Sequence, residues 1–324
     1  MYTLLPRAEA DAANVKAEQV SVWLKYFDLK LRERKLSLLE IAKVLENKNS
    51  CEAAKIVDVL TQHYGVDFNR QVEGEFLLDV AFSDMYCKVN YKAIIAVVNG
   101  GAVPNLVNGD CILVEIIREK NNPLRGRNSL REASRDMEVL LQHGALVNKV
   151  TMIAGVSVLR SPIVEYLLQS NSDEYRKYWL ITRMRLLTRV IQHGAFVNSL
   201  LVAKAIREYV FADFVSGNIP RARLEFILKW FRFAGLSVAK FNLHAAEPIT
   251  RSSDLWSHDQ AVGYDVKAAY VAIEPEPESL QFRCRDVIRH LLMVTQQGRS
   301  ILSAVDSLPL PSLLQSYLKL ADIS

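Results

Sequence analysis

Five stretches of this sequence share one pattern, and that pattern constrains the fold more than any other feature. Each is an apolar helical run that ends at a glycine, followed by a small apolar residue and usually an asparagine. The five are Ile56–Asn69, Ile94–Asn105, Met137–Asn148, Leu187–Asn198 and Phe226–Val238. A glycine at the stop suits the left-handed conformation that closes a helix C-terminus. Because such helix ends cannot cover their own apolar faces, the repetition predicts helices stacked on their neighbours in a solenoid.

Two of these stretches resemble a known repeat family. LLQHGALVN (140–148) and IQHGAFVN (191–198) are similar to the second helix and following loop of ankyrin repeats. The register glycines lie further apart than the roughly 33 residues of an ankyrin repeat, and no TPLHxA motif opens any repeat. Asp110–Ile117 and Ser199–Ile206 stand where the first helices belong. The resemblance implies degenerate, lengthened ankyrin-like repeats, with another kind of helical repeat as the alternative.

The expected fold class is all-α, in three parts. Residues 1–50 are predicted to form an N-terminal helical cap, and residues 51–273 the ankyrin-like repeat array, with inserts at 121–128 and 170–177. The alternating Glu-Pro run at 274–278 resists helix formation and marks a boundary. Residues 274–324 then form a C-terminal module, for which we expect three helices.

The composition indicates a folded protein with no obvious chemistry of its own. Of 324 residues, 50% are apolar and 23% charged, and the net charge is only +4, so a nucleic-acid partner gains little support. The four cysteines form no CxxC pair, which favours a reducing compartment. No signal-peptide core or membrane-length apolar run occurs. We expect a cytoplasmic or nuclear location, no membrane partner and no cofactor.

One stretch, Ser279–Leu320, stands apart from the repeats. Its first part has apolar residues at offsets 0, 4, 7, 8 and 11, the spacing of one helical stripe. They are Leu280, Cys284, Val287, Ile288 and Leu291, and the other sides of that helix carry Arg283, Arg285, Asp286, Arg289 and His290. So short a segment buries little apolar surface alone. It must dock on the rest of the chain, on another protein, or on both.

The same stretch resembles the SOCS box of ubiquitin-ligase adaptors. SLQFRCRDVI is similar to a BC box (279–292), matching at Ser279, Leu280, Cys284 and Ile288. LPLPSLLQSYL is similar to a cullin box (305–320). The match there is Leu308, Pro309, Leu310, Pro311, Leu314, Tyr317 and Leu318. Both halves in order, behind degenerate repeats, make the chain resemble ankyrin-repeat and SOCS-box proteins.

This resemblance implies a non-catalytic adaptor. The repeats would bind an unidentified substrate protein, and the module would bind elongin C (with elongin B), cullin-5 and its RING subunit. The elongin C-binding residues would be Ser279, Leu280, Cys284, Val287, Ile288 and Leu291, and the cullin-binding residues those of the cullin-box match. Cullin-2 stays an alternative to cullin-5. We expect Leu280, Cys284 and Ile288 to be exposed, Pro309, Leu314 and Leu318 partly buried, and the last repeat to be the module's neighbour within the chain.

Three other readings remain open. In the first, the protein is a scaffold whose C-terminal helices only cap the solenoid. In the second, it is an enzyme with an unrecognised site. In the third, it is an adaptor of the F-box kind. A repeated histidine precedes the helix-ending glycine at His63, His143 and His193. Because equivalent positions in a solenoid lie a repeat apart, we expect these residues to have a structural role at helix C-termini rather than to bind metal.

Overall fold

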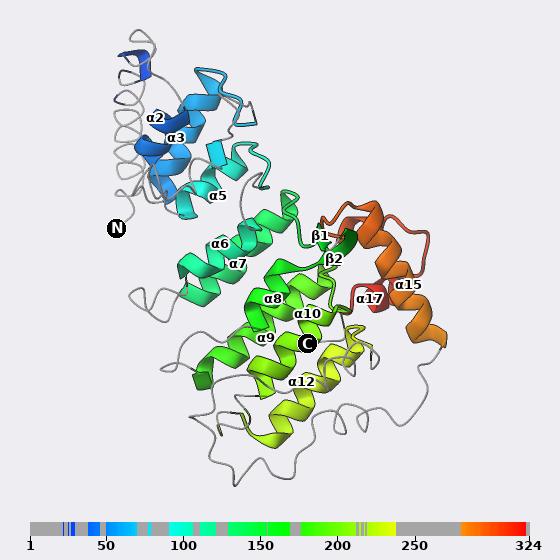
Figure 1. The fold of residues 1–324 in the computed structure, drawn as a ribbon. Helices are drawn as coiled ribbons and strands as arrows, with labels where there is room; N and C mark the ends of the chain where they lie inside the picture. The colour runs from blue at the N-terminus through cyan, green and yellow to red at the C-terminus, as the bar shows by residue number, and fades with distance from the viewer. Residues whose placement is uncertain are drawn as a thin grey trace, which may run out of the picture. The chain divides into compact units, whose positions relative to one another are not determined.

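The computed structural model in Figure 1 describes most of the repeat region and of the C-terminal module. The described ranges are 38–45, 50–69, 91–105, 111–120, 129–153, 155–168, 176–211, 219–237 and 280–321, with residues 22, 25, 27–29, 77–78, 214 and 217. The chain divides into two compact units. Residues 1–112 and 135–145 make unit 1, and residues 113–134 and 146–324 make unit 2.

The regular elements described in unit 1 are helices. It contains α2 (Leu38–Leu45), α3 (Ser50–Gln62), α5 (Tyr91–Asn99) and most of α7 (Ser129–Gln142). Helix α3 packs on α5, and the apolar stripe of each is buried, with Ile56, Leu60 and Ile94 inaccessible to solvent. Burial of these stripes follows from the helical period of the apolar residues in both segments.

Unit 2 holds the other helices whose bounds the described residues give. They are α6 (Ile112–Lys120, whose first residue belongs to unit 1), α8 (Pro162–Leu168), α9 (Arg176–Gln192), α10 (Leu200–Ala205), the π-helix η2 (Ile206–Val210), α12 (Arg221–Phe233), α15 (Leu280–Thr295), α16 (Leu302–Asp306) and α17 (Ser312–Leu318). Helix α8 packs on α9 and α10. Helices α6 and α10 confirm the helices predicted at 110–117 and 199–206. No described helix has the length and apolarity that crossing a bilayer requires.

A β-hairpin corrects the all-α expectation. Strands β1 (Lys149–Ile153) and β2 (Val156–Arg160) pair antiparallel in unit 2, with Lys149 opposite Arg160 and Ile153 opposite Val156. Two runs rich in β-branched residues flank Ala154-Gly155, and Gly155 has a φ of +80° at the tip. Such runs favour strands, and the glycine accepts the turn conformation.

The helix ends confirm the predicted role of the register glycines. Gly65, Gly101, Gly144, Gly194 and Gly235 all have positive φ. At Gly144 the glycine N–H donates to the carbonyl of Leu141, and the next N–H, of Ala145, donates to that of Leu140. The same pair of bonds closes the helices that end before Gly101, Gly194 and Gly235. These are Schellman motifs, in which a left-handed residue lets the chain turn back over the last helical turn.

The recurring asparagines link one helix-end loop to the next. In unit 1, Asn69 Nδ2 donates to the carbonyl of Gly101 at 2.8 Å and Asn105 Nδ2 to that of Gly144 at 3.3 Å. In unit 2, Asn148 Nδ2 donates to the carbonyl of Gly194, and its Oδ1 accepts from the N–H of Phe196, both at 2.7 Å. Asn198 Oδ1 accepts from the N–H of Ser237. The asparagine of the pattern therefore satisfies loop backbone groups that have no partner within their own helix.

Several predictions fall on residues outside those described. They include Ser279, the Glu-Pro run at 274–278, the insert at 121–128 and nearly all of that at 170–177, and most of the N-terminal cap, from which α2 is described.

Candidate functional site

The inner face of α15 carries arginines rather than the apolar stripe. Arg285, Arg289 and Met293, at successive intervals of four residues, are the buried residues of this helix. Arg285 is 1% exposed and Arg289 3%. Buried charges need partners because removing them from water is costly. Those partners are the ends of three other helices.

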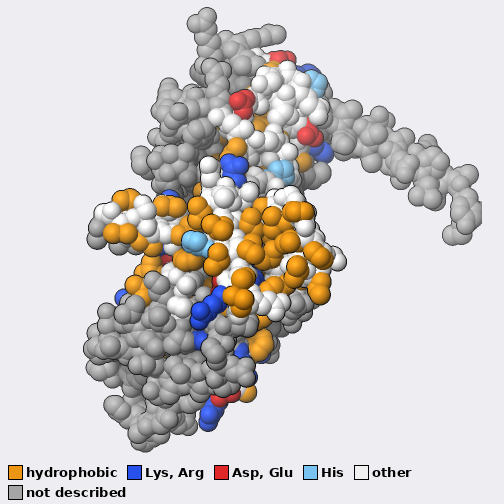
Figure 2. Space-filling view, turned by 90° about the vertical axis from the view of Figure 1, so that its right-hand side faces the viewer, with side chains coloured by type: hydrophobic (Ala, Val, Ile, Leu, Met, Phe, Trp, Pro, Cys, Tyr) orange, Lys and Arg blue, Asp and Glu red, His pale blue; other side chains and the backbone are white. Residues whose placement is uncertain are grey.

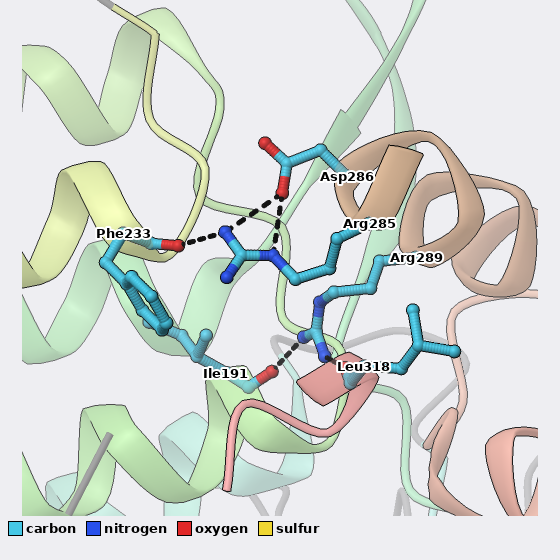
Figure 3. Close-up of polar contacts among 6 residues, drawn as sticks. All are labelled: Ile191, Phe233, Arg285, Asp286, Arg289 and Leu318. Carbon is cyan, nitrogen blue, oxygen red and sulfur yellow. Dashed lines mark hydrogen bonds and ion pairs between the residues drawn. The ribbon is translucent and has the colours of Figure 1, made fainter. Parts of the chain in front are cut away.

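Arg289 bridges two helix C-termini (Figure 3). Its Nη2 donates to the carbonyl of Ile191, in the last turn of α9, and its Nη1 donates to the carbonyl of Leu318, the last residue of α17. The final carbonyls of a helix lack intrahelical donors and carry partial negative charge, so a guanidinium suits them. Burial, with repulsion from Arg285, lowers the pKa of Arg289 to about 9, so the side chain keeps its charge at neutral pH.

Arg285 joins α15 to the end of α12. Its Nη2 donates to the carbonyl of Phe233, at the end of α12, at 2.6 Å, and its Nε lies 3.4 Å from Asp286 Oδ1. Three rings surround the guanidinium carbon, those of Phe282, Phe233 and Tyr317, with centroids at 4.4, 4.5 and 5.0 Å. Among the described residues, Arg285 Nη1 has no hydrogen-bond partner. Cation–π attraction from the rings offsets part of that loss.

The outer face of α15 presents the apolar stripe to solvent. Leu280 is 78% exposed, and Cys284, Val287, Leu291 and Val294 are also exposed. Figure 2 shows hydrophobic side chains gathered in a broad patch on the face of the molecule that carries α15. Contiguous apolar surface of this kind marks an interaction site on a soluble protein. Ile288 corrects one expectation, because it is half-buried against the core of the C-terminal module.

The core of the C-terminal module is small. It consists of Met293, Ile301, Val305 and Leu318. Leu308 and Leu310 are half-buried against it, and Tyr317 is half-buried over Arg285. The expected burial of Leu318 is confirmed. That of Pro309 and Leu314 is wrong, because both are exposed, as are Pro311 and Leu313.

The module contacts other parts of unit 2 besides α12. The carbonyl of Gly298 accepts from the N–H of Val147 at 2.7 Å, and the N–H of Ile301 donates to the carbonyl of His193 at 3.0 Å. The ring Nδ1 of buried His193 lies 2.8 Å from Ser300 Oγ. The loops after α7 and α9, as well as the end of α12, thus hold the module. This contact gives His193 a structural role.

Sequence reasoning missed the two arginines and the hairpin. Arg285, Arg289 and Met293 share one helical face, but two charged residues in three ordinarily mark the solvent side. The hairpin had a readable signal in VTMIAGVSVLR, two strand-forming runs around a glycine. Among the described residues, no group of three or more histidines, cysteines or carboxylates is placed to hold a metal ion.

The comparison with family models agrees with the geometry of the C-terminal module. The model of the SOCS box matches residues 276–319. This segment is a SOCS box. Its presence implies an adaptor function between elongin B/C and a cullin, and SOCS-box proteins are typically non-catalytic subunits of ubiquitin ligases. No curated protein and no solved structure matches the chain significantly.

Proposed function

We propose that this protein is the substrate-receptor subunit of a cullin-5 RING ubiquitin ligase. The observation that carries the proposal is the outward apolar stripe of α15 within a SOCS box whose arginine face is anchored to the repeats. Ubiquitin transfer would belong to the RING subunit and its E2 partner. This chain would contribute proximity, by raising the effective concentration of target lysines near the loaded E2.

Elongin C is the proposed partner of the outer face of α15. Leu280 projects from the first turn and would fill an apolar pocket, which is worth about 1.5–3 kcal/mol for a buried leucine. Cys284 one turn later is small, so a partner helix can approach closely. Val287 and Leu291 continue the stripe, and Ile288 contributes its exposed edge. Ser279 belongs to the proposed site by its place in the motif.

The cullin is the proposed partner of the segment between α16 and α17. Pro309, Pro311 and Leu314 face solvent, while Leu308 and Leu310 reach back to the core and hold the segment in place. Tyr317 and Leu318 face inward and would act by positioning α17 rather than by direct contact. Leu313, which the motif does not include, is as exposed as Leu280 and joins the proposed surface. The choice of cullin-5 rests on the Leu-Pro-Leu-Pro form of the motif.

The repeats are the proposed receptor for a target protein. The Schellman ends and the asparagine bonds between successive loops support an ankyrin-like stack in each unit. Stacked repeats expose long surfaces that suit protein targets. We propose a cytoplasmic or nuclear location, where cullin ligases act.

Co-purification with elongins B and C tests this function. We expect the full chain to retain both elongins and Leu280→Ala plus Cys284→Ala to lose them. Phe226→Ala, an exposed apolar residue on α12, is the matched control and should retain them. Titrating the complex with cullin-5 and with cullin-2 then compares the two cullins. Failure of the unmutated chain to retain elongins would exclude the proposal.

A scaffold function has one observation in its favour. Arg285 and Arg289 donate hydrogen bonds to carbonyls at the C-terminal ends of α12 and α9, as a capping element would. A chain in which the module is only a cap would bind no elongin. Both functions predict that deletion of residues 279–324 destabilises the repeats, so that deletion does not distinguish them. Co-purification with the elongins does.

A further inference from the structure

The β-hairpin carries apolar side chains that nothing in the described chain covers. Val150, Met152 and Val156 are 64%, 66% and 63% exposed, comparable to the stripe of α15. A two-stranded hairpin has no core of its own to account for such residues. Surface of this kind on a soluble protein marks an interaction site.

The base of the hairpin is fixed to the protein. Ser161 Oγ donates to the carbonyl of Val147 at 2.9 Å and closes the two strands at their open end. Arg160 Nε donates to Glu165 Oε1 at 3.1 Å and ties β2 to α8. Leu159 packs on the core of the SOCS box. The hairpin is therefore held in a defined place beside the SOCS box.

The strand register separates its two faces. Val150 is opposite Leu159, and Met152 is opposite Ser157. Residues directly opposite each other in an antiparallel pair project to the same face, and residues two apart in a strand share a face. Val150 and Met152 thus lie on the face of Leu159. Val156 is opposite Ile153 and belongs to the other face.

The Leu159 face, defined as Val150, Met152, Ser157 and Leu159, continues from the cullin-box half of the SOCS box. Leu159 packs on the same small core as Leu308 and Leu310. That core is built from the C-terminal end of α15, from α16 and from Leu318 of α17. The residue just before the hairpin, Asn148, donates its N–H to the carbonyl of Gly298, in the turn between α15 and α16. Leu280 lies at the other end of α15, a 16-residue helix of about 24 Å. The hairpin face is therefore continuous with the proposed cullin-binding surface rather than with the proposed elongin C-binding surface.

We propose that Val150 and Met152 extend the cullin-binding surface, so that the cullin contacts the repeat region as well as the SOCS box. Five-residue strands reach about 17 Å from the base. In this proposal, a cullin seated on the exposed Pro309 and Pro311 would also reach that face, because both surfaces border the core that Leu159 and Leu310 share. This inference rests on the proposed function, because it requires that the chain binds a cullin.

The test is a titration of the full chain, in complex with elongins B and C, with cullin-5. Val150→Ser plus Met152→Ser should weaken cullin binding at least about tenfold, through loss of two buried apolar contacts. Val156→Ser, on the opposite face of the same hairpin and equally exposed, should bind cullin as the unmutated complex does. Retention of elongins by each variant shows that its SOCS box is folded, and Met152→Asp provides a second, single-residue test.

The outcomes separate this inference from the proposed function. If the unmutated chain retains no elongin or its complex binds no cullin, the proposed function and this inference both fall. If the unmutated complex binds cullin and the double variant binds it equally well, only the inference is overturned. Loss of target protein with unchanged cullin binding would also overturn it, and would assign the hairpin to the receptor surface.

Discussion

Helices α12 and α15 are both amphipathic, but they bury opposite faces. In α12, Leu224, Ile227, Leu228 and Phe231 are buried, and Arg221 and Lys229 face solvent. In α15, Arg285 and Arg289 are buried, and Leu280, Val287 and Leu291 face solvent. A helix that packs only within its own chain buries its apolar stripe. One that presents that stripe must be held by other means, and in α15 these are hydrogen bonds from guanidinium groups to helix ends.

The largest loss of stability is expected when a core side chain is removed from α12. Phe231→Ala removes a fully buried ring and should lower the free energy of unfolding by about 3–5 kcal/mol. Phe226→Ala, on the exposed side of the same helix, should change it by less than about 0.5 kcal/mol. Equilibrium urea unfolding of the full chain measures both. Equal effects would mean that α12 does not bury the face described.

The turn after α15 should be the next most sensitive point. Gly298 has a φ of +81°, and a Cβ there would lie 2.3 Å from the backbone oxygen of Asn148. Gly155 has a φ of +80° with open space around it. We expect Gly298→Ala to cost about 2–4 kcal/mol, as strain plus overpacking, and Gly155→Ala about 1–2 kcal/mol, as strain alone.

Thermal unfolding of the two glycine variants, converted to free energies, makes that comparison. Similar costs at both positions would show that the loop after α7 does not pack closely on Gly298.

Removal of a buried arginine should loosen α15 without touching its outer face. Arg289→Met leaves the carbonyls of Ile191 and Leu318 without their donor and should cost about 1.5–3 kcal/mol, the range for hydrogen bonds to charged groups. Arg283→Met, on the exposed side, should be nearly neutral. Hydrogen exchange of the amides in α15 and α17 measures the loosening. Unchanged protection in the Arg289 variant would contradict the anchoring role.

The smallest effect on stability is expected where the effect on binding is large. Leu291→Ser replaces an exposed residue and should change the free energy of unfolding by less than about 0.5 kcal/mol. The same change should weaken elongin C binding about tenfold, because a leucine that is exposed in the free chain becomes buried in the complex. Calorimetric titration with the elongin B/C pair measures the affinity. A large loss of stability would show that the stripe serves the chain's own fold.

Much of the fold was readable from the sequence because helical periodicity and glycine stops are local signals. The ends of α5, α7, α9 and α12, the helices α6 and α10, and the apolar stripe of α15 were all predicted. The bonds of Asn148 to Gly194 and Phe196 were not, since a pairing across 46 residues and more leaves no local trace. The half-burial of Ile288 likewise depends on where Ile301 and Val305 return in space.

The sequence by itself determined that the C-terminal helix is amphipathic and that its stripe carries the residues of a SOCS box. Only the tertiary structure decided which side of that helix faces inward. Period and composition favour burying Leu280 and exposing Arg289, and they would do so in most proteins. Here the carbonyls that end α9, α12 and α17 converge behind α15. They are hydrogen-bond partners for the two arginines that cannot be identified from the sequence. Because the arginine face is buried, the apolar stripe faces outward, where another protein can bind it.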